Sequence, residues 1–211
     1  MTTQGMKPAP IIVGITGASG APYAVRLLQL LTVANRPVSL IVSRYGLRLL
    51  ATEMGIESIE ALRTAVGAAA WDSCITVHAN DDRGAAPASG SALSAGMVVC
   101  PCSMGTLSAI SIGASRSLIE RAADVTLKEQ RKLILMPRET PLSAVHLENM
   151  LRLARAGAVV MPASPAFYHR PKAIPDLIDF VVARMLDHLG VEQSLVKRWT
   201  GEDPDAGQES E

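Results

Sequence analysis

The sequence contains few aromatic residues and no excess of either charge. Phe, Trp and Tyr make up 3% of the 211 residues while 48% are hydrophobic, so Ala, Val, Ile, Leu and Met must build the core. This composition favours an α/β sandwich over a small all-β domain. The formal net charge is zero, without a run of like charges in the body of the chain, which argues against nucleic acid or an anionic membrane as a partner.

Candidate metal ligands are also scarce. The three cysteines, Cys74, Cys100 and Cys102, include no second closely spaced pair to complete a zinc site, and we expect them in the core or in turns. His146 and Glu148 lack the i, i+4 histidine pair of a metalloprotease. The sequence therefore predicts that the protein holds no metal.

Targeting and linker segments are missing as well. The first ten residues show no signal-peptide pattern, and no apolar run is long enough to span a bilayer, so we expect a cytoplasmic protein with no membrane partner. Because no linker divides the chain, residues 10–199 are predicted to form a single domain. It lies between a flexible N-terminus, 1–9, and an acidic tail, 200–211, whose composition predicts disorder.

Apolar β-branched runs alternate with helical patterns along the chain, as in parallel βαβ units. A helix is predicted from the N-cap Ser143 to the stop at Gly157, and another from Ile174 to Gly190. In the first of these, apolar residues are expected on one face, namely Val145, Leu147, Met150, Leu151 and Ala154. The strands are expected at Pro10–Thr16, Val38–Ser43, Cys74–His78, Met97–Pro101, Lys132–Pro137 and Ala158–Pro162.

The first predicted strand ends in a glycine-containing turn, within "VGITGASGAPYAVRLL". Gly14, Gly17 and Gly20 do not fit the G-x-G-x-x-G spacing of a dinucleotide-binding turn, nor the glycine pattern of short-chain dehydrogenases. The turn still offers free N–H groups and the Ser19 hydroxyl at the positive end of a helix, which suits an anion or a polar ring edge. An ordinary tight turn between a strand and a helix remains an alternative.

Polar residues follow most of the predicted strands, and in a parallel sheet these positions share one carboxyl edge. Within "VVCPCSMGTLSAISIGA" a second helix start offers hydroxyls, and two such helix starts suit a ligand with a phosphate and a second polar end, such as flavin mononucleotide. Each residue by itself has an ordinary loop explanation, but their convergence points to a ligand site. The residues at this edge are Ser19, Ser43, Ser103, Thr106, Arg138, Glu139 and Tyr168.

Cationic residues follow in "SLIERAADVTLKEQRKLILMPRETP". Arg121, Lys128 and Arg138 are spaced so that a helix and the next strand end could converge on one anion. Arg138 and Glu139 follow a buried strand, where arginine can bind phosphate with two hydrogen bonds and the adjacent carboxylate can move a proton. The alternative is a charge pair that merely caps the loop.

Five segments together resemble the UbiX-type flavin prenyltransferases, and the resemblance extends from about Ile11 to Trp199. It implies a Rossmann-like α/β fold, a three-layer sandwich with a mainly parallel sheet, assembled into a homododecamer. It also implies the reaction: dimethylallyl monophosphate alkylates reduced FMN at N5, a second bond to C6 closes a ring, and phosphate leaves. The segments are "GITGASGAPYAVRLL", "APASGS", "VVCPCSMGTLSAI", "LIERAADVTLKEQRKLILMPRETPLSAVHLENM" and "GAVVMPASPAFYHRP".

The resemblance also implies roles for matching positions, some of them supplied by neighbouring subunits. Ser19, Glu53 and Glu139 are expected to take part in the chemistry, although Glu53 alone reads as an exposed helix charge. The prenyl phosphate is expected to contact Arg121, Lys128, Glu139, Tyr168 and Arg184. The FMN is expected to contact Gly17, Ala18, Ser19, Ser43, Ser103, Met104, Gly105, Thr106 and Arg138.

The sequence agrees with metal-free prenyl transfer. Asp81 and Asp82 form the only Asp-Asp pair, and "RGA" follows it, so the D-D-x-x-D magnesium pattern of diphosphate prenyltransferases is absent. Cationic side chains must then neutralise the departing phosphate. A monophosphate is a sensible substrate for such a metal-free reaction. Two departures from the family, "DDRGA" before "APASGS" and Ser117 before "LIERAAD", leave the shape of the prenyl pocket open.

Two other functions remain open on the sequence. An FMN-dependent cysteine-type decarboxylase would share the fold and the FMN site, but its active-site His and its P-x-M-N-x-x-M motif are absent from "MPASPAFYH". A non-catalytic FMN carrier, or accessory subunit of a decarboxylase, would not need the cationic residues. The expected recipient of the product is a UbiD-type decarboxylase, of ubiquinone biosynthesis or of aromatic acid breakdown.

Overall fold

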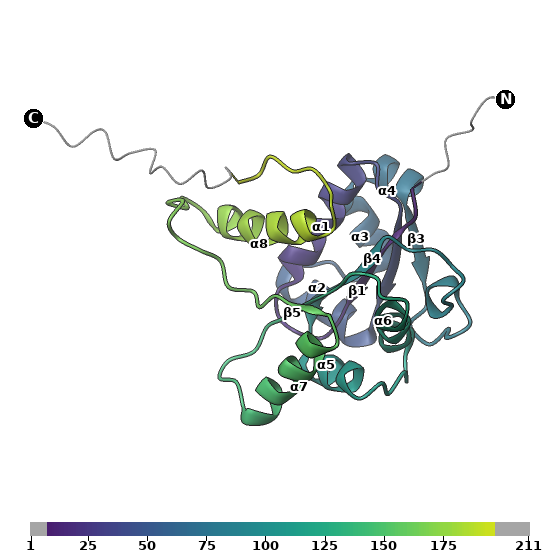
Figure 1. Cartoon of the computed structure of the whole chain (residues 1–211). Helices are drawn as coiled ribbons and strands as arrows, with labels where there is room; N and C mark the ends of the chain where they lie inside the picture. The colour runs from purple at the N-terminus through teal and green to yellow at the C-terminus, as the bar shows by residue number, and fades with distance from the viewer. Residues whose placement is uncertain (1–7, 197–211) are drawn as a thin grey trace, which may run out of the picture.

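The computed structural model describes residues 8–196, and six strands in this range form one wholly parallel sheet (Figure 1). The strand order is β3-β2-β1-β4-β5-β6, so the chain winds outward from β1 in both directions. The predicted α/β, Rossmann-like sandwich is thereby confirmed. The strands are β1 Ile11–Ile15, β2 Val38–Val42, β3 Ile75–His78, β4 Gly96–Cys102, β5 Leu133–Pro137 and β6 Val159–Val160.

Helices cover both faces of the sheet, and Figure 1 shows α1 and α8 on one side with α5, α6 and α7 on the other. The helices following β1 and β2 are α1 Ala21–Val33, α2 Arg44–Met54, α3 Ile59–Val66 and α4 Ala68–Cys74. A short 3-10 turn, η1, spans Ala86–Ala88. The later helices are α5 Met104–Ser111, α6 Leu118–Lys128, α7 Ala144–Arg155 and α8 Ile174–His188.

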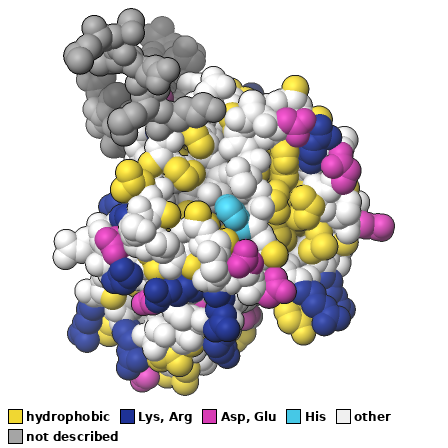
Figure 2. Space-filling view, turned by 90° about the vertical axis from the view of Figure 1, so that its right-hand side faces the viewer, with side chains coloured by type: hydrophobic (Ala, Val, Ile, Leu, Met, Phe, Trp, Pro, Cys, Tyr) yellow, Lys and Arg dark blue, Asp and Glu magenta, His cyan; other side chains and the backbone are white. Residues whose placement is uncertain are grey.

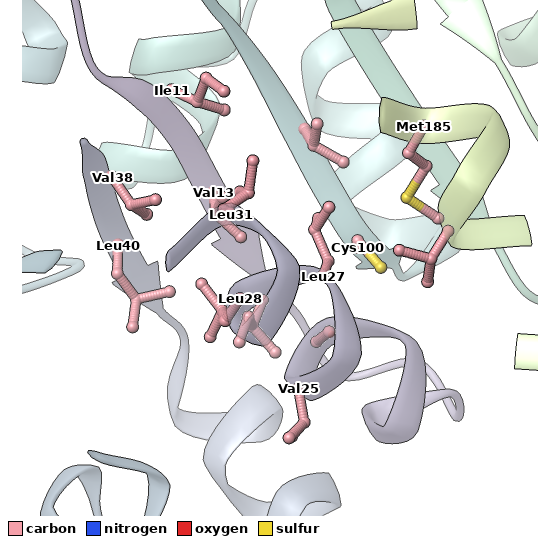
Figure 3. Close-up of a cluster of buried hydrophobic side chains, with 14 of the residues drawn as sticks. Ile11, Val13, Val25, Leu27, Leu28, Leu31, Val38, Leu40, Cys100 and Met185 are labelled. Atoms are coloured by element: carbon pink, nitrogen blue, oxygen red, sulfur yellow. The ribbon is translucent and has the colours of Figure 1, made fainter. Parts of the chain in front are cut away.

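Two hydrophobic cores lie on the two faces of the sheet because side chains alternate along each strand. In β1, Ile11 and Val13 point into the core beneath α1 and α8, whereas Ile12 points into the core beneath α5 and α6. Figure 3 shows the first core, in which Leu27 and Leu28 of α1 pack over the strands. Nearly all of these side chains are aliphatic, as the scarcity of aromatic residues required.

The predicted strands are all present, with ends that differ by at most two residues. Cys74 was expected to begin a strand, but it ends α4 instead. The edge strand β6 shrinks from the expected Ala158–Pro162 to Val159–Val160, since only Ile134 and Leu135 of β5 pair with it. The expectations for residues 1–9 and 200–211 fall almost wholly outside the described residues, and the single-domain boundary stays a prediction.

Helix α7 begins after the predicted N-cap Ser143, whose Oγ accepts the backbone N–H of His146 at 3.2 Å. The expected apolar face was largely wrong: Leu151 is 50% exposed and Ala154 is also exposed, and Val145 and Leu147 are 62% and 53% exposed. These two residues lie about 200° apart around a helix, so they cannot share one buried face. Leu153 is the buried side chain of this helix.

The surface carries both signs of charge. Figure 2 shows Lys and Arg side chains gathered on the lower part of one face, with Asp and Glu among them, which agrees with the formal net charge of zero. Within residues 8–196, none of the helices combines the length and the apolar character needed to cross a membrane.

Candidate active site

Three of the helices that begin at the carboxyl edge of the sheet, α2, α5 and α6, are each capped by a serine. Ser43 Oγ accepts the Gly46 N–H at 3.0 Å at the start of α2, and Ser103 Oγ accepts the Thr106 N–H at 3.3 Å at the start of α5. At the start of α6, Ser117 Oγ accepts the Glu120 N–H at 3.3 Å. Because each helix N-terminus carries partial positive charge, the three together favour an anion.

A cavity of about 220 Å³ opens between these three helix starts. It brings together three of the predicted strand-end residues, Ser43, Ser103 and Thr106, whereas Ser19, Arg138, Glu139 and Tyr168 are not among its lining residues. Its wall is made mostly of hydroxyl, amide and glycine groups. Its lining residues are Thr16, Gly17, Ser43, Tyr45, Asn80, Ser103, Thr106, Ser117, Ile119 and Glu120.

Thr16 fixes the floor of this cavity. Its buried hydroxyl donates to the Pro101 carbonyl at 2.8 Å and accepts the Ser103 N–H at 2.7 Å. These two bonds tie the end of β1 to the end of β4, so the glycine turn and the start of α5 are held side by side. Thr16 is therefore a structural support for both ligand-facing turns.

Gly17 and Gly46 allow α2 to lie very close to the end of β1. A Cβ at Gly17 would lie 2.5 Å from Tyr45 Cβ, and a Cβ at Gly46 would lie 2.4 Å from the Ile15 carbonyl oxygen. Real Cβ atoms do not approach other atoms so closely, so both positions require glycine at this packing distance. Gly105 differs, because a Cβ there would meet nothing within 4 Å.

Tertiary packing brings the carboxylate of Glu53, a residue of α2, to the start of α1. Its Oε2 accepts the N–H groups of Gly20 at 3.0 Å and Ala21 at 2.8 Å, 32 residues or more away in sequence. Glu53 is exposed on α2, as the sequence suggested, but its carboxylate also caps a helix that has no side-chain cap of its own. Ser19, half-buried, lies directly before this contact.

The other residues predicted to contact FMN differ in whether their side chains are exposed or buried. Met104 is 9% exposed and packs into the core beneath α5 and α6, so its backbone rather than its side chain faces the carboxyl edge of the sheet. Ala18 is also buried. Arg138 and Glu139 are exposed directly after β5, and Glu139 Oε1 accepts the Thr140 N–H at 3.1 Å.

The predicted prenyl-phosphate residues do not meet within one chain. Arg121 and Lys128 lie two turns apart on α6, about 10 Å along the helix axis, and each pairs with a neighbouring carboxylate, Asp124 or Glu129. On the opposite face of the sheet, Arg184 of α8 lies 3.2 Å from Asp187.

Tyr168 lies on the same side of the sheet as Arg184. Its ring contacts Phe180 of α8 edge-on, with ring centroids 5.9 Å apart. The α6 residues and the α8 residues of one chain therefore stand apart, and they can contact one ligand only if different subunits supply them.

Sequence reasoning did not assign six of the ten lining residues to the site, although it linked Ser117 to the shape of the prenyl pocket; the six are Thr16, Tyr45, Asn80, Ser117, Ile119 and Glu120. Asn80 follows β3 and its Oδ1 accepts the Ile119 N–H at 3.2 Å, so the strand-end rule, applied to the third strand as well, would have found it. Ser117 and Glu120 form the S-x-x-E pattern of a helix start, which was a usable signal.

The cysteines offer no nucleophile at this edge. Cys100 and Cys102 are fully buried in β4, and burial raises the pKa of Cys102 to about 12, so this thiol stays protonated at neutral pH. Across residues 8–196, no group of three or more His, Cys, Asp or Glu side chains is arranged to hold a metal ion.

Fold and site together define an α/β protein of the nucleotide-binding type, with a polar pocket at the carboxyl edge of a parallel sheet. A model of the Flavoprotein family matches residues 2–186. The flavin prenyltransferase UbiX of Pseudomonas aeruginosa is 49% identical over 199 residues, covering 91% of this chain and 94% of the relative. The chain belongs to the flavoprotein family and, within it, to the UbiX flavin prenyltransferases.

Two solved structures resemble the whole described fold. A UbiX protein crystallised with FMN and dimethylallyl pyrophosphate superposes with a TM-score of 0.85 at 40% identity, covering 93% of this chain and all of the other. A dodecameric FMN-dependent UbiX-like decarboxylase from Escherichia coli O157:H7 gives a TM-score of 0.83 at 42% identity, covering 91% of this chain and all of the other.

Proposed function

We propose that this protein is a flavin prenyltransferase that joins the dimethylallyl group of dimethylallyl monophosphate to reduced FMN and releases phosphate. The structural observation that supports this proposal is the cavity at the carboxyl edge, where three capped helix starts and the glycine turn meet. Relatives named flavin prenyltransferase at up to 49% identity support the reaction. The cysteine-type decarboxylase and the non-catalytic carrier are not favoured by these relatives.

The residues present fit a flavin mononucleotide. Helix N–H groups and the hydroxyls of Ser43, Ser103 and Thr106 suit its phosphate, and the open space over Gly105 leaves the backbone accessible. Reduced FMN would supply the nucleophilic nitrogen N5 and carbon C6. The Gly17 turn with Ser19 then orients the ring edge, and Arg138 offers paired donors to an anionic group.

Negative charge builds up on the departing phosphate as the allylic C–O bond breaks, and this charge must be stabilised. We assign this task to Arg121, Lys128, Tyr168 and Arg184. The three cationic side chains supply positive charge, and the Tyr168 hydroxyl donates a hydrogen bond to the departing phosphate. Glu139 holds and transfers the proton that accompanies phosphate release. The bond to N5 would use a nitrogen electron pair, while the pair of the broken C–O bond leaves on phosphate. The bond to C6 would use an electron pair of the flavin ring, and it requires that the prenyl C=C bond takes up a proton and that C6 loses one.

The assignment requires a homo-oligomer, since α6 and α8 of one chain lie on opposite faces of the sheet. We propose a dodecamer, supported by the UbiX-like relative whose dodecameric structure is 42% identical. The product then passes to a UbiD-type decarboxylase.

The test is anaerobic incubation of the protein with reduced FMN and dimethylallyl monophosphate. We expect a flavin heavier by one prenyl unit and one phosphate released for each flavin modified. A parallel incubation with dimethylallyl pyrophosphate decides which phosphate ester is the substrate. A protein that binds FMN without either product is a carrier, and one that releases carbon dioxide from a peptidyl cysteine is a decarboxylase.

Turnover is expected to survive exhaustive chelation. The chain lacks the D-D-x-x-D pattern that recruits magnesium, and cationic side chains are assigned to the leaving phosphate. Initial rates are measured before and after EDTA treatment, with and without added Mg²⁺. Loss of turnover in EDTA that magnesium restores would contradict the metal-free mechanism.

Ser19→Ala is expected to retain FMN while slowing or misdirecting the prenyl transfer. Ser19 lies in the turn next to the Glu53 contact, and the phosphate end of the cavity is built from other hydroxyls. FMN affinity and the product mass are measured on the same preparation. If the variant fails to bind FMN, Ser19 has a cofactor-binding role instead.

A further inference from the structure

The charge of the cavity wall does not suit a phosphate by itself. Among the ten lining residues, Glu120 is the one with a charged side chain, and its charge is negative. The residue is 8% exposed, so the carboxylate is poorly screened by water. A bare carboxylate there would oppose the three helix starts that favour an anion.

Glu120 is held by a single neighbouring residue, Arg116. Its Oε2 accepts the Arg116 backbone N–H at 2.8 Å and the Arg116 Nε–H at 3.2 Å, while its Oε1 accepts from Nη2 at 3.1 Å. This is the forked geometry in which arginine binds a carboxylate most specifically. The Arg116 side chain is 69% exposed, so one side of the guanidinium remains open to solvent.

We propose that Arg116, which does not itself line the cavity, neutralises the Glu120 charge in the cavity wall and so makes the protein prefer flavin mononucleotide to unphosphorylated riboflavin. The inference rests on the proposed function, because it assumes that the flavin phosphate occupies the cavity. With Arg116 present the pair is neutral and the helix starts act unopposed. Without it, the Glu120 charge repels the phosphate.

This charge balance predicts a definite order among variants. Arg116→Ala weakens FMN binding by roughly tenfold at low ionic strength, and less at high salt. Glu120→Gln binds FMN at least as tightly as the parent, since it removes the negative wall charge. The double variant recovers most of the affinity that Arg116→Ala alone loses, whereas riboflavin affinity stays within about twofold in every variant.

The experiment titrates FMN and riboflavin into the flavin-free, full-length protein and follows flavin fluorescence at two ionic strengths. Arg155→Ala is the matched control, because it removes one exposed arginine from the last turn of α7. The dimethylallyl monophosphate KM of Arg116→Ala is measured in parallel. Preferential loss of FMN with recovery in the double variant supports the proposal.

Three outcomes overturn it. FMN and riboflavin affinity falling together, with a lower melting temperature, means that Arg116 and Glu120 only form a helix cap. Arg116→Ala behaving like Arg155→Ala means that the charge has no role. A raised KM for the prenyl phosphate with unchanged FMN affinity assigns Arg116 to the other phosphate. A folded parent that binds no FMN contradicts the proposed function itself.

Discussion

Glu139→Gln is expected to keep both ligands and to lose most of its turnover. Glu139 cannot attract a phosphate dianion by charge, so its use must be to hold and transfer a proton as phosphate departs. Glutamine preserves the shape and the Oε1 acceptor that receives the Thr140 N–H, but it cannot transfer that proton. Proton transfer by a positioned side chain is worth a factor of roughly a hundred or more in rate.

Single-turnover kinetics with reduced FMN already bound isolate this step from ligand binding. Glu148→Gln, on the exposed face of α7, is the matched control for loss of one carboxylate. Arg138→Ala should behave in the opposite way and lose FMN or phosphate affinity, since arginine offers a permanent charge and planar donors. Parent-like turnover of Glu139→Gln would mean that Glu139 only orients Arg138.

The sheet was predictable because buried parallel strands read as continuous apolar runs. β1, β2, β4 and β5 are almost fully buried, and each was placed within two residues of its ends. The apolar pattern could not give the length of β6, since pairing at a sheet edge depends on the neighbouring strand. It also could not separate Cys74 of α4 from β3, where helix and strand meet without a turn.

The site was predictable where it follows strands and not where it depends on tertiary contacts. Ser43 and Ser103 come directly after strands, so the carboxyl-edge rule places them at the cavity. Glu53 lies at the far end of α2, and only the packing of α2 against α1 brings its carboxylate to Gly20 and Ala21. No local pattern encodes such a contact.

Two glycines of this site are expected to respond in opposite ways to one added methyl group. In Gly46→Ala the new Cβ meets the backbone oxygen of Ile15 at 2.4 Å, so β1 or α2 must move. Overpacking against backbone costs about 3 kcal/mol of unfolding free energy, which lowers the melting temperature by roughly 10 °C in a chain of this size. The shift also disturbs the Ser43 cap, because the Gly46 N–H is its donor.

Gly105→Ala serves as the matched comparison at the start of α5. Its Cβ meets no protein atom within 4 Å, and alanine is the better helix former, so the melting temperature should stay the same or rise slightly. The same methyl group lies where the proposed FMN needs close access to backbone, so FMN affinity should fall in this variant. Thermal unfolding and FMN titration of both variants, at one protein concentration, measure the two effects separately. A stable Gly46→Ala would show that α2 can move away from β1 at little cost, and unchanged FMN affinity in Gly105→Ala would place the flavin away from the start of α5.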